Sequence, residues 1–173
     1  MINEIWKTII IIVTIAVLLL IGIAAICFLK NNKKENNSGT SKAFSMIYKG
    51  VEVLPGTKFD ENQIEEKANF SEIPSCAFSE TDKVYTYEGI EIIVAQIDNI
   101  DKVYSVYFIN DLAQTGEGLK ISDNKQKMIE TYGEDYNLSM DNKYTYTREN
   151  VELSFIVENN IITSIEYTLK TDK

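Results

Sequence analysis

The sequence predicts an α+β fold, in which an N-terminal transmembrane helix precedes two tandem repeats of one helix and three antiparallel strands. Three observations predict it. A long uncharged run stands near the N-terminus, Tyr-Thr-Tyr occurs twice, and a helix-start pattern precedes each occurrence. We expect a stub at 1–7, the membrane helix at 8–29, a linker at 30–43 and the repeat domain at 44–173.

The segment 8–29 contains 22 residues and no charged side chain. A helix of that length, rising about 1.5 Å per residue, exceeds a bilayer hydrocarbon core about 30 Å thick. The length favours an uncleaved signal anchor, because the apolar region of a cleaved signal peptide is shorter. Cys27 follows Ile26 and not a small residue, so we interpret it as membrane packing and not as a lipidated cysteine. The polar segment 30–43, with its Ser-Gly pair, is interpreted as a flexible linker.

The first repeat, at about 44–112, opens with a helix signal. Pro55-Gly56 marks a turn, and Asp60 is placed to accept the first free amide hydrogens of a short helix. Three strand-like runs follow, which are "KVYTY", "GIEIIVAQI" and "KVYSVYF". Asp98-Asn99 stands between the last two, and both residue types tolerate the backbone of a tight hairpin.

The second repeat, at about 113–173, has the same order of signals. Ser122 or Asp123 is placed to cap a helix, and Gly133 supplies a left-handed stop. Its apolar face would consist of Met128, Ile129 and Tyr132. The strand-like runs are "KYTYT", "NVELSFIVE" and "IITSIEYTL", with Asn159-Asn160 between the last two. The alternation in "NVELSFIVE" indicates one buried and one solvated face.

The two Tyr-Thr-Tyr stretches align at an offset of 59 residues. We therefore expect Tyr85 and Tyr144 to occupy equivalent places, and likewise Tyr87 and Tyr146. Two interpretations of these four tyrosines stand. They form an exposed recognition surface, since tyrosine is enriched at interfaces, or they pack across the sheet and under the helices.

This helix-and-meander pattern, with "GLKISDNKQKMIETYGEDY" leading into the tyrosine strand, resembles a group of uncharacterised Gram-positive membrane-anchored proteins and lipoproteins. It is also similar to the tandem repeat of the β-lactamase inhibitory protein and, one repeat at a time, to envelope-assembly lipoproteins of the SmpA/OmlA type. The resemblance covers roughly 47–169. It implies a protein-binding or assembly role at the cell envelope, through the concave face of the sheet, and it transfers no functional residue.

Two signals indicate on which side of the membrane the folded domain lies, and they disagree. Lys7 precedes the apolar run, whereas Lys30, Lys33 and Lys34 follow it, which by the positive-inside rule places the domain in the cytoplasm. Proteins of the group that the chain resembles are typically exported. We expect a single-pass protein of the cell membrane with an extracellular domain, and the alternative is a regulatory or sensor module on the cytoplasmic side.

Composition argues against several classes of function. The net charge is -9 and Arg148 is the single arginine, so the surface repels nucleic-acid phosphates. The chain has no histidine, which removes the commonest general base and the usual zinc ligand. Cys76 is the one cysteine after the apolar run, so we interpret it as a small buried residue or as half of an intermolecular disulfide. We expect no enzyme, cofactor or metal site.

The sequence thus predicts a non-catalytic module of the cell envelope, held in the membrane by 8–29, that binds an unknown protein partner. A further alternative is a domain that binds a cation or a small ligand with its acidic surface. The oligomeric state stays open.

Overall fold

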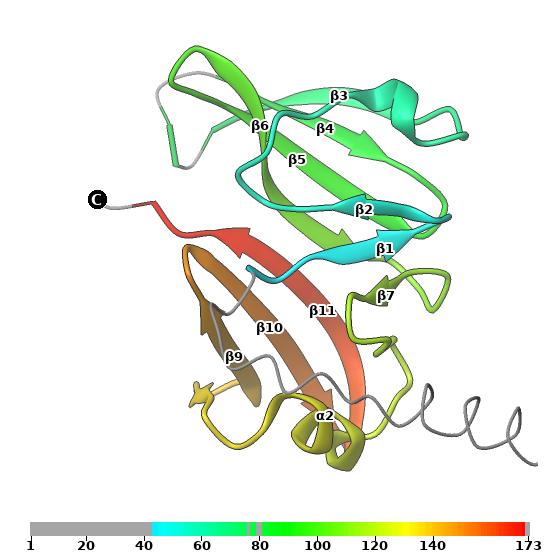
Figure 1. Ribbon diagram of the computed structural model, residues 1–173, viewed down its shortest axis with the longest axis vertical. Helices are drawn as coiled ribbons and strands as arrows, with labels where there is room; N and C mark the ends of the chain where they lie inside the picture. The colour runs from blue at the N-terminus through cyan, green and yellow to red at the C-terminus, as the bar shows by residue number, and fades with distance from the viewer. Residues whose placement is uncertain (1–42, 76, 79–80, 172–173) are drawn as a thin grey trace, which may run out of the picture. The chain divides into compact units, whose positions relative to one another are not determined.

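An eight-stranded antiparallel sheet dominates the computed structural model, which describes residues 43–75, 77–78 and 81–171 (Figure 1). Its strand order is β3-β4-β5-β6-β11-β10-β9-β8. The bounds are β3 Asn69–Pro74, β4 Thr81–Thr86, β5 Ile90–Ile97, β6 Ile100–Phe108, β8 Asn137–Leu138, β9 Lys143–Arg148, β10 Val151–Glu158 and β11 Ile161–Leu169. A second sheet has the order β2-β1-β7, with β1 Met46–Tyr48, β2 Val51–Val53 and β7 Gln114–Thr115. A 3-10 turn η1, Glu61–Gln63, and a helix α2, Lys125–Tyr132, complete the described elements.

The predicted α+β fold of two helix-plus-three-strand repeats is wrong, because the described chain is mainly β and the first repeat contains no α-helix. Asp60 does accept a hydrogen bond from Asn62 N, at 3.0 Å, but the turn that it caps ends at Gln63. Two features disfavour a longer helix here. Ile64 is the one buried side chain among residues 60–70, so a helix would have no apolar face to bury. Glu61 and Glu65 would also repel each other one helical turn apart. The chain continues instead into β3.

The second helix forms, but it begins later than the sequence predicts. Its cap is Asn124, whose side chain accepts from Lys127 N at 2.8 Å, and not Ser122 or Asp123. Ser122 has a positive φ of 78°, which is outside the extended backbone of a cap. Gly133 ends the helix as predicted, with φ 84° and its N–H bonded to the carbonyl of Ile129.

The prediction that this is a single-pass protein of the cell membrane also needs correction. Among residues 43–75, 77–78 and 81–171, no helix is long and apolar enough to cross a membrane. The eight residues of α2 span about 12 Å, against about 30 Å for a hydrocarbon core. The segment 8–29 on which the prediction depended, the lysines beside it and Cys76 all lie outside the described residues.

The two halves of the large sheet are related by an offset of 61 residues and not 59. Tyr85 pairs with Ile92, and Tyr146 pairs with Leu153, at the same place in each first hairpin. Tyr85 is therefore equivalent to Tyr146, and Tyr87 to Arg148. The predicted equivalences of Tyr85 with Tyr144 and of Tyr87 with Tyr146 are both wrong. In the first half Tyr-Thr-Tyr ends directly before the hairpin turn, whereas in the second half two residues separate it from the turn. Aligning the two Tyr-Thr-Tyr stretches therefore misaligns the hairpins by two residues.

The halves meet at an approximate two-fold axis between β6 and β11. The pairs at this junction are Tyr107–Glu166, Val106–Tyr167 and Ser105–Thr168. With the offset of 61, Val106 pairs with its own equivalent, Tyr167, and the two flanking pairs exchange with each other. The sheet therefore runs outward from this junction to two opposite edge strands, β3 and β8.

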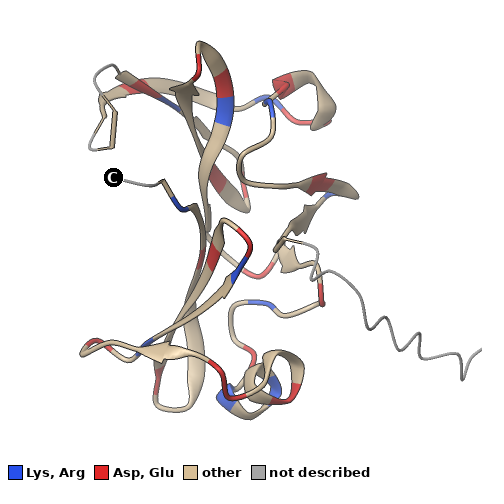
Figure 2. Cartoon of the chain, turned by 60° about the vertical axis from the view of Figure 1, so that its left-hand side comes forward, with Lys and Arg blue, Asp and Glu red and all other residues tan. Residues whose placement is uncertain are grey.

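One face of the large sheet carries the core. The strands β1, β2 and β7 and the helix α2 all lie on that side of it (Figure 1, Figure 2). Their apolar side chains and those of the sheet form one cluster, which includes Met46, Tyr48, Phe155 and Tyr167. Each fully buried side chain of this size contributes about 1.5–3 kcal/mol to stability.

Glu66 joins three segments at the margin of this core. Its carboxylate accepts hydrogen bonds from the Tyr48 hydroxyl and from Glu88 N, each at 2.8 Å. Lys49 Nζ lies 2.9 Å from the same carboxylate. The Tyr48 hydroxyl also accepts from Gly89 N at 3.1 Å, so one network fixes β1 against the β4–β5 turn.

We expect this network to make the fold sensitive to acid. Burial favours a raised pKa for Glu66, but bonds from Lys49, Glu88 N and Tyr48 lower that pKa below its ordinary value of 4.5. The stabilisation is therefore complete above about pH 4.5 and is lost as the pH falls through the folded-state pKa. Glu66→Gln should reduce the loss of stability between about pH 5 and about pH 3, measured by urea unfolding. The exposed Glu65→Gln is the control, and equal pH dependence in the two variants would contradict the assignment.

Candidate functional site

The edge strand β3 is the feature of the described chain that is most open to a partner. All six of its residues are exposed, and it pairs with β4 without a register shift. No other described strand pairs with its outer side. The opposite edge, β8, has two residues only. Proteins commonly protect edges by shortness, bulges, charged side chains or proline. β3 is six residues long and has no bulge, and of these devices it carries only Glu72 and, at its last position, Pro74.

The backbone groups that β3 presents follow from the ladder. Tyr87 N donates to the Ile90 carbonyl at 2.8 Å, which fixes the residues of β4 that bond to β5. Because bonding alternates along an antiparallel strand, the amide groups of Phe70 and Glu72 point away from β4. Pro74 is the next such position and has no N–H to offer. The edge therefore presents two donors and three acceptors.

The side chains of β3 offer apolar contacts on both faces. Phe70 is 55% exposed, and its ring lies 5.2 Å from that of Tyr85. On that side a shallow pocket of about 490 Å³ extends towards Glu61 and Glu66. Ile73 is 41% exposed and faces the opposite side, where it borders a second cavity. An added strand would cover both side chains.

The four predicted tyrosines do not form one surface. Tyr87, Tyr144 and Tyr146 are buried, with exposed fractions of 3%, 5% and 3%, and Tyr85 is half-buried. Tyr144 and Tyr146 both contact the ring of Tyr136, whereas Tyr85 contacts Phe59 and Phe70 and Tyr87 contacts Tyr48. Burial raises the pKa of Tyr87 and of Tyr146 to about 12, so both hydroxyls stay protonated at neutral pH. Their positions match the packing interpretation, and only Tyr85 borders β3.

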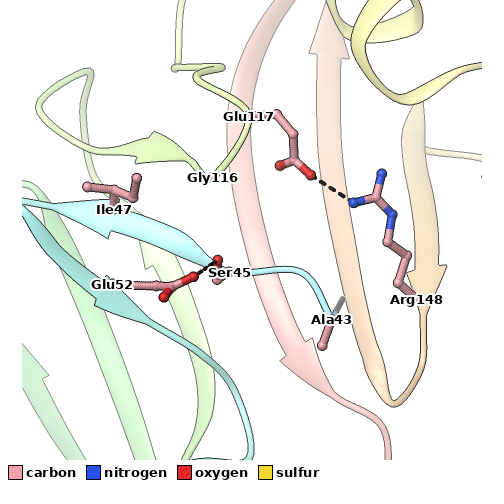
Figure 3. Close-up of a pocket in the computed structure, with 7 residues that line it drawn as sticks. All are labelled: Ala43, Ser45, Ile47, Glu52, Gly116, Glu117 and Arg148. Atoms are coloured by element: carbon pink, nitrogen blue, oxygen red, sulfur yellow. Dashed lines mark hydrogen bonds and ion pairs between the residues drawn. The ribbon is translucent and has the colours of Figure 1, made fainter. Parts of the chain in front are cut away.

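A third pocket, of about 230 Å³, lies between the small sheet and the β9–β10 turn (Figure 3). The guanidinium of Arg148 contacts Glu117 at 2.8 Å and lies 4.2 Å from the ring centre of Phe44. Ser45 donates to Glu52 at 2.7 Å. The charged groups of this pocket thus already bind other parts of the chain, so the arrangement supports a structural role for the single arginine.

The sequence did not predict β3. Phe70 and Ile73 differ in parity, so "NFSEIP" lacks the alternation that indicates a strand, and its acidic surroundings resemble a helix surface. Among the described residues, no group of three or more His, Cys, Asp or Glu side chains is placed to hold a metal ion.

Comparison of the chain with protein-family models, with curated proteins and with solved structures finds no match. The resemblance to envelope proteins therefore stays a prediction.

Proposed function

We propose that this protein is a non-catalytic binding module whose edge strand β3 pairs with an extended segment of another protein. The observation that supports the proposal is the contrast between the two sheet edges, one reduced to two residues and the other a continuous six. Strand addition of this kind takes its affinity from main-chain hydrogen bonds and its selectivity from side-chain pockets.

The charge around β3 indicates the chemistry of the partner. Glu72 lies on the strand itself and Glu61 and Glu65 precede it, against Lys67 in the same stretch. Glu66 is already paired with Lys49. The whole chain carries 26 acidic and 17 basic residues. In a segment that alternates apolar and basic residues, the basic side chains would lie on the face of Glu72 and the apolar side chains on the opposite face, beside Ile73.

The expected affinity is modest. Phe70 and Glu72 offer four main-chain hydrogen bonds, each worth about 1 kcal/mol net. Covering Phe70 and Ile73 adds about 1.5–3 kcal/mol for each side chain at most. Association costs on the order of 4–15 kcal/mol, so the net gain is about 6 kcal/mol at most, and we expect a Kd of about 40 µM or weaker.

The test is an array of immobilised ten-residue peptides in which apolar and lysine residues alternate, probed with the full chain. Glu72→Pro removes an outward N–H and no bond to β4, so it should weaken binding about tenfold or more. Glu72→Ala keeps the N–H and removes one screened charge, so its effect should stay below about threefold.

Two results would contradict the proposal. One is equal binding by the Glu72→Pro and Glu72→Ala variants. The other is a dimer of the free chain, seen by size-exclusion chromatography, that Glu72→Pro dissociates, since a second copy would then occupy the edge.

A further inference from the structure

The outer face of the large sheet, opposite the small sheet and α2, contains a cavity of about 280 Å³. Val106 belongs to the core, so its neighbours Ser105 and Tyr107 point to the outer face. The apolar side of the cavity consists of Ile73, Pro74, Ala77 and Ile93, and the aromatic side of Tyr104 and Tyr107. Its volume is close to the lower end of the range that small ligands occupy, about 300–1,000 Å³.

Two buried polar residues line this cavity, Asp82 at 5% exposed and Ser105 at 1% exposed. Asp82 Oδ1 has no hydrogen-bond partner among the described residues, whereas the Ser105 hydroxyl interacts with that of Tyr107. A buried carboxylate without a counter-charge is costly, so its presence here calls for a group that offsets the cost.

Among the described residues, the cations near this face already have partners. Lys143 lies 2.9 Å from Glu166, the second carboxylate of the cavity, which also accepts from Thr168 at 3.0 Å. Lys83 follows Asp82 in the chain but points to the other face, where it pairs with Asp101. The charge of Asp82 is therefore the one that an incoming group would meet.

We infer that this cavity binds an alkylammonium group, with its nitrogen against the Asp82 carboxylate and its carbon chain against the apolar lining residues. A primary ammonium donates three hydrogen bonds and carries the single positive charge that one carboxylate requires. The rings of Tyr104 and Tyr107 add cation–π contacts. Calcium requires six to eight oxygen ligands, and the cavity offers one unpaired carboxylate.

The inference stands apart from the proposed function of β3. The ammonium is supplied either by a free small amine or by a lysine side chain of a peptide. The probes are n-butylammonium, the neutral isostere 1-butanol, and the capped tripeptide acetyl-Gly-Lys-Gly-amide, each titrated into the full chain by calorimetry. Tighter binding of the tripeptide identifies a lysine side chain as the source, and tighter binding of n-butylammonium identifies a free amine.

We expect n-butylammonium to bind at least about tenfold more tightly than 1-butanol. Asp82→Asn should weaken binding of n-butylammonium by about tenfold or more, because it removes the carboxylate that the ammonium contacts. Glu158→Gln, an exposed change at a distant turn, is the matched control. Equal binding of the amine and the alcohol, or unchanged amine binding by Asp82→Asn, would overturn the inference.

Stability provides an independent readout. Without ligand, Asp82→Asn should leave the urea midpoint unchanged or raise it, because it removes an unpaired buried charge. A midpoint that falls would show that the folded chain already compensates Asp82, and the inference would fail. Glu72→Pro should leave amine binding unchanged, so failure of this site and failure of the β3 edge are distinguishable.

Discussion

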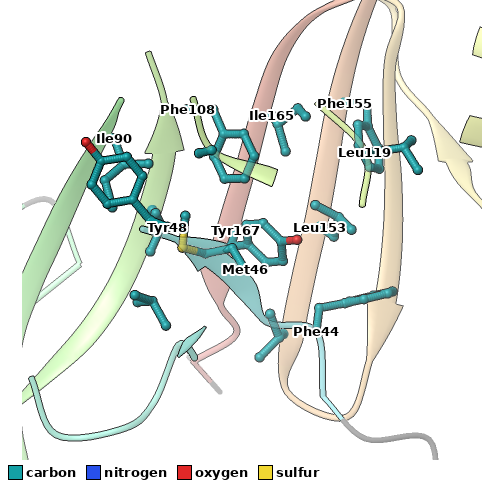
Figure 4. Close-up of a cluster of buried hydrophobic side chains, with 14 of the residues drawn as sticks. Phe44, Met46, Tyr48, Ile90, Phe108, Leu119, Leu153, Phe155, Ile165 and Tyr167 are labelled. Carbon is teal, nitrogen blue, oxygen red and sulfur yellow. The ribbon is translucent and has the colours of Figure 1, made fainter. Parts of the chain in front are cut away.

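Phe155→Ala is expected to lower the free energy of unfolding by about 3–5 kcal/mol. Phe155 lies at the centre of β10 and is fully buried. Figure 4 shows Phe155 within the buried cluster. Its ring contacts those of Tyr132 in α2 and Tyr146 in β9, at centroid distances of 5.4 and 6.1 Å. Truncation would remove the packing between the helix and two strands and would leave a cavity that the rigid sheet cannot close.

Urea unfolding monitored by circular dichroism measures this loss. The matched control is Phe155→Leu, which keeps most of the volume and should cost less than about 1.5 kcal/mol. A loss below about 1 kcal/mol for Phe155→Ala would contradict the position of α2 over this part of the sheet.

Gly89→Ala is expected to destabilise the fold by about 1–3 kcal/mol through overpacking. A Cβ at this position would lie 2.6 Å from Cε2 of Tyr48 and 3.0 Å from Cβ of Leu112. Tyr48 cannot move aside freely, because it is fully buried and its hydroxyl bonds both Glu66 and Gly89 N. The clash would therefore disturb β1 as well as the β4–β5 turn.

Glu88→Ala in the same turn is the control, since its side chain is 67% exposed and its loss should change stability by less than about 0.5 kcal/mol. Equal unfolding midpoints for Gly89→Ala and Glu88→Ala would show that β1 does not pack on the turn as described.

The local residue pattern was sufficient to predict the long strands and the tight turns between them. The alternation of Val151, Leu153 and Phe155 places all three side chains in the core, as predicted. Asp98-Asn99 and Asn159-Asn160 connect neighbouring strands and have positive φ, which these residue types tolerate. These features depend on residues that are near neighbours in the chain.

Features that depend on contacts between distant parts of the chain could not be predicted from the sequence. The small sheet pairs β1 with β7, whose residues are far apart in the chain, and no local pattern indicates that pairing. Tyr87 packs against Tyr48 of β1, so its burial could not be predicted either. The strand β3 was not predicted, because a strand that is exposed on both faces has no alternation of apolar and polar residues.

Amide hydrogen exchange of the full chain, with and without the tightest peptide from the lysine-alternating array, tests the central claim most directly. We predict that exchange at Phe70 and Glu72 slows on binding, because their N–H groups point away from β4. Exchange at Asn69 and Ser71, whose amides already bond to β4, should not change. Unaltered exchange at Phe70 and Glu72 with saturating peptide, or slowing confined to β8, would contradict the account.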